Sequence, residues 1–212
     1  MDKHSEEKRN NRGKKFWNRY AGLYDAEVLR FSGKAYEEMY KKMGDAFTPD
    51  MRVLEIATGT GLISIHVAKY VHSIEATDYS PKMIAVAQKK KSPDNVRFSV
   101  EDGTNLSYAD NSFDAVIISN ALHIMPDPDA VLDNIRRVLK PGGLLIAPTF
   151  SHGHGTGGKL NTFILKLVGF ETYSKWTPEE FVAMIGRSGF TVKTWCVLDA
   201  AFPLVYLEAG LG

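Results

Sequence analysis

Acidic residues stand at or just after the ends of the first three predicted strands of this 212-residue chain. Glu55 closes the first strand, Asp78 closes the second, and Asp102 follows the third. Because the carboxyl ends of parallel strands meet at one edge of a sheet, these carboxylates are expected to line one rim. The second can accept hydrogen bonds from both hydroxyls of a ribose, and the third can accept from an exocyclic amine. The pattern therefore predicts an adenosine site.

A glycine turn follows the first strand and belongs to the same rim. It reads Glu55-Ile56-Ala57-Thr58-Gly59-Thr60-Gly61, and an amphipathic run begins directly after it. A strand, a glycine turn and a helix bring bare backbone close to a bound nucleotide. The dinucleotide fingerprint needs a third glycine, and this chain has Ser64 there. The missing glycine and the acid beneath the turn favour an adenosine with a cationic tail, such as S-adenosylmethionine, over a pyrophosphate.

Strands and helices alternate through most of the chain, which is typical of a parallel sheet with right-handed crossovers. The predicted strands are Arg52–Ile56, Ser73–Asp78, Asn95–Val100, Phe113–Ile118, Gly143–Thr149, Thr191–Leu198 and Leu204–Ala209. Ser80-Pro81, Asp127-Pro128 and Thr177-Pro178 each place a capping residue before a proline, which predicts three helix starts. The short join between the last two strands predicts a hairpin. We therefore expect an α/β, Rossmann-like, doubly wound sheet of seven mostly parallel strands, with one antiparallel C-terminal strand.

The length of the chain suits one domain with local additions. Residues 1–15 are almost wholly polar and rich in lysine and arginine, so we expect a flexible basic arm. Residues 16–212 are predicted to form a single domain. Within it, residues 16–47 have a helical pattern and are expected to cover the site as a lid. Residues 151–176, with a short helix at Leu160–Leu167, are expected to form an insertion on the substrate side.

Composition excludes several classes of protein. A formal net charge of +1 argues against a dedicated nucleic-acid binder, and no apolar run reaches the roughly 20 residues of a membrane-spanning helix. The polar N-terminus is unlike a signal peptide. Cys196 is the only cysteine, and His152 and His154 alone make a poor metal site, so neither a disulfide nor a metal is expected. These features predict a cytoplasmic protein.

Five motifs in order resemble those of the class I S-adenosylmethionine-dependent methyltransferases. They are Glu55–Gly61, Ala76–Met83 with Asp78, Glu101–Thr104 with Asp102, Ser112–His123 and Leu139–Gly143. Tyr20–Asp25 resembles the entry segment of the branch that methylates quinones and small molecules. Ala57 departs from the family, which most often has glycine there, and its methyl group either limits the backbone to negative φ or strains it. The resemblance implies in-line methyl transfer from S-adenosylmethionine to a small-molecule or lipid-like acceptor.

The pattern and the resemblance together give a candidate site. Cofactor contacts are expected from Tyr20, Glu55, Ala57, Gly59, Thr60, Gly61, Asp78, Tyr79, Met83, Asp102, Gly103, Thr104, Ser119 and Asn120. His123 is a candidate general base, because an imidazole titrates near neutral pH, and its alternative role is structural. Tyr24 is the second candidate catalytic residue. It shares a helical face with Trp17 and Tyr20, which could form an aromatic lid or simply pack in the core.

Three other functions remain open at this point. A membrane-surface methyltransferase of quinones or phospholipids would use the basic arm for peripheral contact with the bilayer. A nicotinamide-dependent oxidoreductase would need the third glycine. A regulator that binds S-adenosylmethionine without catalysis would share the cofactor residues and form no S-adenosylhomocysteine. The expected partner is a small-molecule or lipid-like acceptor, and no nucleic acid is expected.

Overall fold

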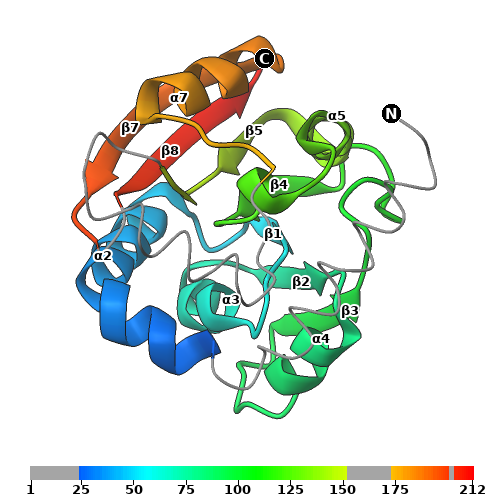
Figure 1. The fold of residues 1–212 in the computed structure, drawn as a ribbon. Coiled ribbons are helices and arrows are strands. Elements are labelled where there is room, and N and C mark those ends of the chain that lie inside the picture. The colour runs from blue at the N-terminus through cyan, green and yellow to red at the C-terminus, as the bar shows by residue number, and fades with distance from the viewer. Residues whose placement is uncertain (1–23, 152–172, 201–202) are drawn as a thin grey trace, which may run out of the picture.

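The computed structural model describes residues 24–151, 173–200 and 203–212, and of residues 24 and 26–31 only the backbone (Figure 1). The expected basic arm, the first part of the lid with Trp17 and Tyr20, and most of the 151–176 insertion lie outside the described residues. His152, His154 and the expected helix at Leu160–Leu167 are also outside them. Among the described residues, no helix is both long and apolar enough to cross a membrane.

In the described part of the chain, a mixed sheet of eight strands forms the centre of the fold, in the order β3-β2-β1-β4-β5-β8-β6, with β7 paired to β8. Its strands are β1 (Arg52–Ile56), β2 (Ser73–Asp78), β3 (Val96–Val100), β4 (Phe113–Ile118), β5 (Leu139–Ile146), β6 (Thr149–Phe150), β7 (Phe190–Leu198) and β8 (Leu204–Leu211). The first five strands are parallel, and β8 runs antiparallel to both β5 and β7. The predicted class of fold, including the antiparallel C-terminal strand, is confirmed.

The eighth strand arises where the predicted fifth strand is interrupted. Ala147 still donates to the carbonyl of Leu207, at 3.0 Å, but the next residue is Pro148, which has no N–H to donate. Pairing with β8 resumes at Thr149 and Phe150 as the short β6. The single predicted strand is therefore two consecutive strands, β5 and β6, which both pair with β8.

The start of β5 was also predicted too late, at Gly143. Instead, β5 begins at Leu139, directly after the helix that precedes it, and its register against β4 shifts between Phe113 and Ala115. The predicted Pro-Gly-Gly turn is thus an irregularity inside the strand. Gly142 has a φ of 75°, and a Cβ on Gly143 would lie 2.7 Å from the carbonyl oxygen of Lys140. Glycines allow this crowded bend.

The three helices with a predicted cap begin where that cap predicts. The described helical elements are α2 (Tyr24–Ala46), α3 (Leu62–Val67), η1 (Ala68–Tyr70), α4 (Pro81–Ala87), η2 (Leu122–Ile124), α5 (Pro128–Val138) and α7 (Pro178–Arg187). Ser80 caps α4 by accepting from Met83 N, and Asp127 caps α5 in the same way. Thr177 and Glu180 form the predicted capping box of α7.

Two apolar clusters cover the two faces of the sheet. Alternate residues of the central strands point to opposite sides, so Leu54 belongs to one cluster and Val53 to the other. The first cluster packs α5 and α7 against the sheet, and the second packs α2 and α3 (Figure 1). Both faces are therefore buried, as a parallel sheet requires, and its carboxyl edge is the place where loops can form a site.

Candidate cofactor site

The register of the first three strands brings the three predicted acids to one edge. Glu55 pairs with Ala76, and Asp78 pairs with Val100, in neighbouring parallel ladders. Asp102 follows β3 by two residues. The carboxylates therefore lie at the carboxyl ends of strands that are adjacent in space, as the sequence predicted.

The carboxylate of Asp78 connects the glycine turn to the turn after β2 by hydrogen bonds. Its Oδ2 accepts from Gly59 N and its Oδ1 from Ser80 N, both at 2.8 Å. Burial raises the pKa of Asp78 above its ordinary value, and these two hydrogen bonds oppose that rise. A carboxylate has about four acceptor positions. Two are used here, so about two remain for a ligand with a pair of hydroxyls.

The glycine turn contains three residues with a left-handed backbone. Ala57 has φ 57°, Gly59 has φ 58° and Gly61 has φ 77°. Of the two consequences expected for alanine at 57, the structure thus shows strain, which costs about 1–2 kcal/mol for a residue with a Cβ. Gly61 is needed for a second reason, because a Cβ there would lie 2.6 Å from Cε1 of Phe98.

The buried carboxyl of Glu55 accepts hydrogen bonds from the glycine turn and from the helix that follows it. Glu55 is only 1 % exposed, and its Oε2 accepts from the hydroxyls of Thr58, at 2.7 Å, and of Ser64. Ser64 occupies the place of the missing third glycine, so the departure from the dinucleotide pattern supplies a hydrogen-bond donor. Burial raises the pKa of Glu55 to about 7, although the hydrogen bonds from Ser64 and Thr58 act in the opposite direction.

The raised pKa of Glu55 makes the free energy of unfolding depend on pH. The raised pKa means that the folded state binds more protons than the unfolded state between pH 4.5 and about 7. The free energy of unfolding therefore falls as pH rises through this window. Glu55→Gln keeps an acceptor for the two hydroxyls and cannot titrate. We expect the stability of the wild type relative to this variant to fall by about 3 kcal/mol from pH 4.5 to about pH 8 in urea unfolding. A difference that is constant with pH would show that the pKa of Glu55 is the same in the folded and unfolded states.

Asp25 of α2 connects the helical lid to the turn. It accepts from the hydroxyl of Thr60 and forms an ion pair with Lys90, which follows α4. Asp25 lies in the segment Tyr20–Asp25, but its contact with the site was not among the predicted ones. The sequence marks Asp25 only as an acid directly after Tyr24, and this pattern does not identify Thr60 or Lys90 as its partner.

The loop after β3 holds Asp102 near the rim. Asp102 is exposed, and its Oδ1 accepts from Thr104 N at 2.9 Å and from the Thr104 hydroxyl at 2.7 Å. Tyr79 and Val100, at the ends of β2 and β3, are 42 % and 48 % exposed. Met83, expected beside Tyr79, is almost wholly buried and presents little surface to a ligand. Tyr79 and Val100 therefore provide the accessible apolar surface beside Asp102.

The residues after β4 are held by contacts within the protein. Asn120 has φ 51°, donates from Nδ2 to the Tyr36 hydroxyl at 3.0 Å, and accepts at Oδ1 from Phe150 N at 2.9 Å. His123 is buried in η2, with Nδ1 3.1 Å from the Thr149 hydroxyl. This burial agrees better with its structural role than with that of an accessible base. Ser119, beside Asn120, is partly exposed.

The aromatic residues of α2 are distributed differently from the expectation. Tyr24 begins α2, its side chain is outside the described residues, and so is all of Tyr20. Tyr36 reaches Asn120 instead. Tyr40 stacks on His66, and its buried hydroxyl has no hydrogen-bond partner among the described residues. Neither Tyr36 nor Tyr40 was among the predicted site residues, although a buried tyrosine hydroxyl usually finds a hydrogen-bond partner, as that of Tyr36 does here.

Known proteins resemble this chain in sequence and in fold. Residues 54–147 match the family described as "Methyltransferase domain". A demethylmenaquinone methyltransferase of Renibacterium salmoninarum is 43 % identical over 104 residues, which are 49 % of this chain and 43 % of that protein. The chain thus spans less than half the length of this relative. Within the described part of the chain, no three His, Cys, Asp or Glu side chains gather as a metal site.

Solved structures share the fold at low identity. A complex of DhpI with SAH has a TM-score of 0.73 and 20 % identity, covering 95 % of this chain and 96 % of that one. The cyclase SpnF has a TM-score of 0.70 and 20 % identity, covering 84 % and 81 %. These matches agree with the five motifs quoted above. The chain therefore shares the fold of these solved structures, and its residues 54–147 match the methyltransferase domain family.

Proposed function

We propose that this chain binds S-adenosylmethionine and transfers its methyl group to a small-molecule or lipid-like acceptor. The observation that carries the proposal is Asp78. Its two oxygens are fixed by the N–H groups of Gly59 and Ser80, so the carboxylate is preorganised beside the glycine turn. The methyltransferase match over residues 54–147 includes every one of these groups.

Each part of the cofactor has a chemical partner on this rim. The ribose hydroxyls donate to the two remaining acceptor positions of Asp78. The adenine lies against Tyr79 and Val100, and its exocyclic amine donates to Asp102. Because Thr104 N–H is already bonded to Asp102, we assign the donor to a ring nitrogen to Gly103 N–H. The methionine end lies over the backbone of Ala57 and Gly59.

The bound cofactor supplies an activated methyl carbon, so the main task of the protein is alignment. Holding the acceptor atom, the methyl carbon and the sulfur in line can supply about 7–11 kcal/mol of barrier reduction. The residues proposed to line the acceptor side are Ser119 and Asn120, with Tyr36 from α2. A base is required only for a weakly nucleophilic acceptor such as a phenol, and His123 and Tyr24 stay as candidates for that role.

For the acceptor, we propose a quinol or a related aromatic compound. The support is the 43 % identity to a demethylmenaquinone methyltransferase, which covers about half of this chain. A lipid-like acceptor would also give a role to the basic residues 1–15 at a membrane surface.

Two measurements on the full chain test this function. Calorimetric titration with S-adenosylmethionine, S-adenosylhomocysteine and NADH should show binding of the first two and none of the third. A screen of quinols, phospholipids, amines, thiols and phenols, scored by release of S-adenosylhomocysteine, should then give turnover with a quinol. Binding of NADH alone would favour an oxidoreductase. Cofactor binding without turnover in any class would favour a regulator.

The hydrogen bond between Asp25 of α2 and Thr60 of the glycine turn predicts that α2 contributes to cofactor affinity. Asp25→Ala removes the acceptor of Thr60 and the partner of Lys90. A hydrogen bond to a charged group contributes about 1.5–3 kcal/mol, so we expect S-adenosylhomocysteine to bind about tenfold more weakly in calorimetry. Asp45→Ala, at an exposed position of the same helix, is the matched control and should leave the affinity unchanged. Equal affinities for the two variants would show that the contacts of Asp25 do not contribute to cofactor binding.

A further inference from the structure

The segment that carries Asp102 has no regular secondary structure between β3 and β4. Such a segment needs partners for its backbone groups, because they are not paired in a ladder. The side chain of Leu106 packs into the apolar cluster that contains Val131 and Leu132 of α5. The backbone on either side of Leu106 is fixed by other contacts.

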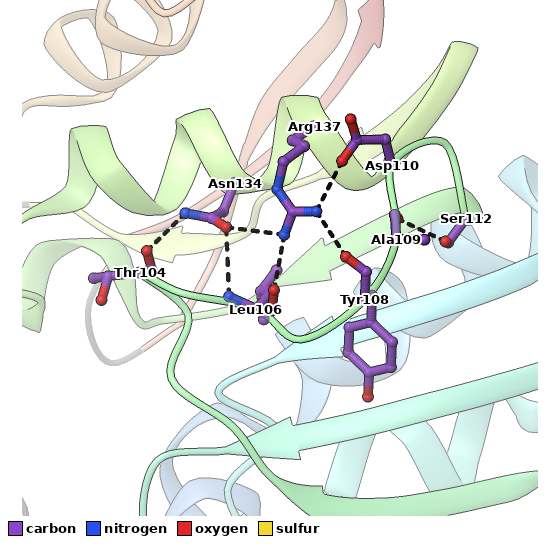
Figure 2. Close-up of polar contacts among 8 residues, drawn as sticks. All are labelled: Thr104, Leu106, Tyr108, Ala109, Asp110, Ser112, Asn134 and Arg137. Carbon is purple, nitrogen blue, oxygen red and sulfur yellow. Dashed lines mark hydrogen bonds and ion pairs between the residues drawn. The ribbon is translucent and has the colours of Figure 1, made fainter.

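Two side chains of α5, three residues apart, provide this fixation (Figure 2). Arg137 donates from Nη2 to the Leu106 carbonyl at 2.8 Å and from Nη1 to the Tyr108 carbonyl at 2.6 Å. Asn134 donates from Nδ2 to the Thr104 carbonyl at 2.7 Å. Residues at i and i+3 share a helix face, so one face of α5 holds three alternate carbonyls of the segment.

The two side chains also position each other. Arg137 Nη2 lies 3.2 Å from Asn134 Oδ1, and the same oxygen accepts from Leu106 N at 3.4 Å. Arg137 additionally contacts Asp110, but Asp110 is 68 % exposed, and exposed ion pairs contribute little. The planar fork of the guanidinium, more than its charge, therefore matches the two carbonyls.

Thr104 connects this pair to the candidate site. Its carbonyl accepts from Asn134, and its N–H and hydroxyl both donate to Asp102. Asn105 N also donates to the Asp102 carbonyl, at 2.9 Å. A displacement of Thr104 would thus move the carboxylate assigned to the exocyclic amine and the neighbouring Gly103 N–H.

We propose that Arg137 and Asn134 are positioning residues that set the selectivity of the site for adenine over a 6-oxo purine. The inference rests on the proposed function, since it needs the adenosyl group to lie at Asp102. Neither side chain touches the ligand. They act through Thr104, whose position determines whether Asp102 meets an amine that donates or a carbonyl oxygen that is repelled.

The test compares S-adenosylhomocysteine with S-inosylhomocysteine, which carries a 6-oxo purine, by calorimetry on the full chain. The wild type should prefer the adenine compound. Arg137→Lys keeps the charge and loses the fork, so its affinity for S-adenosylhomocysteine should fall about tenfold while that for S-inosylhomocysteine changes less than threefold. Arg136→Lys is the matched control, because Arg136 directly precedes Arg137 and bonds to exposed Asp133 at 3.3 Å. It should keep the wild-type ratio.

Asn134→Asp tests the same link without changing Arg137. It keeps the oxygen that accepts from Arg137 and Leu106 and replaces the donor to Thr104, so the ratio should fall here too. The inference is overturned if both variants keep the wild-type ratio, or if both ligands lose affinity equally. The proposed function fails separately, when the wild type binds neither compound.

Discussion

Asp78→Ala is expected to weaken the binding of S-adenosylhomocysteine at least a hundredfold. The carboxylate is assigned two hydrogen bonds from the ribose, and hydrogen bonds to a charged group contribute about 1.5–3 kcal/mol each. Two such bonds correspond to about 3–6 kcal/mol, and every 1.4 kcal/mol is a factor of ten in affinity. The variant also releases the N–H groups of Gly59 and Ser80, which loosens both turns. Isothermal calorimetry measures the loss.

Two further variants give this experiment its controls. Asp78→Asn keeps the size of the side chain and one acceptor, so it should preserve the fold and still bind at least tenfold more weakly. Asp133→Ala removes an exposed acid of α5 and should bind normally. An affinity within threefold of the wild type for Asp78→Ala would refute the assignment of the ribose to this carboxylate.

Gly61→Ala is expected to lower the free energy of unfolding by about 2–5 kcal/mol. A residue with a Cβ at φ 77° costs about 1–2 kcal/mol. The added methyl would also lie 2.6 Å from the Phe98 ring, and overpacking of a core costs about 1–3 kcal/mol. Urea unfolding followed by circular dichroism measures the change.

A second glycine gives the matched comparison. Gly186 lies inside α7, and a Cβ there would meet no atom within 4 Å. Gly186→Ala should therefore stabilise the protein by up to about 1 kcal/mol. In the double variant Gly61→Ala/Phe98→Leu, the packing part of the cost should be recovered and the backbone part should remain. Equal stabilities of Gly61→Ala and the wild type would contradict the close approach of the turn to β3.

Local sequence patterns predicted the frame of the site well. The bounds of β1, β2 and β4 agree with the prediction residue for residue. Each is a short apolar run that ends at an acid or a turn, and such a run is typical of a strand buried on both faces. Once these strands are parallel neighbours, the positions of Glu55, Asp78 and Asp102 on one edge follow from chain geometry.

Contacts between distant segments could not be predicted in this way. Asp25 is separated by 35 residues from Thr60 and by 65 from Lys90, and nothing in the local pattern around Asp25 names either partner. The same holds for Tyr36 and Asn120, which are 84 residues apart. The hydroxyl partners of Glu55 lie three and nine residues further along the chain, and no local pattern marks Thr58 and Ser64 as its donors. The left-handed backbone at Ala57 was one of two stated outcomes, and only the surrounding structure selects it.

The position of β8 between β5 and β7 has a consequence for the synthesis of the chain. Residues 204–211 leave the ribosome after all the other strands, yet they pair with β5 in the interior of the sheet. Until then, β5 presents an open row of backbone donors and acceptors beside the apolar residues Leu144, Leu145 and Ile146. A nascent or prematurely terminated chain would thus expose β5 as an unpaired, apolar edge strand. Such surfaces are bound by chaperones and promote aggregation.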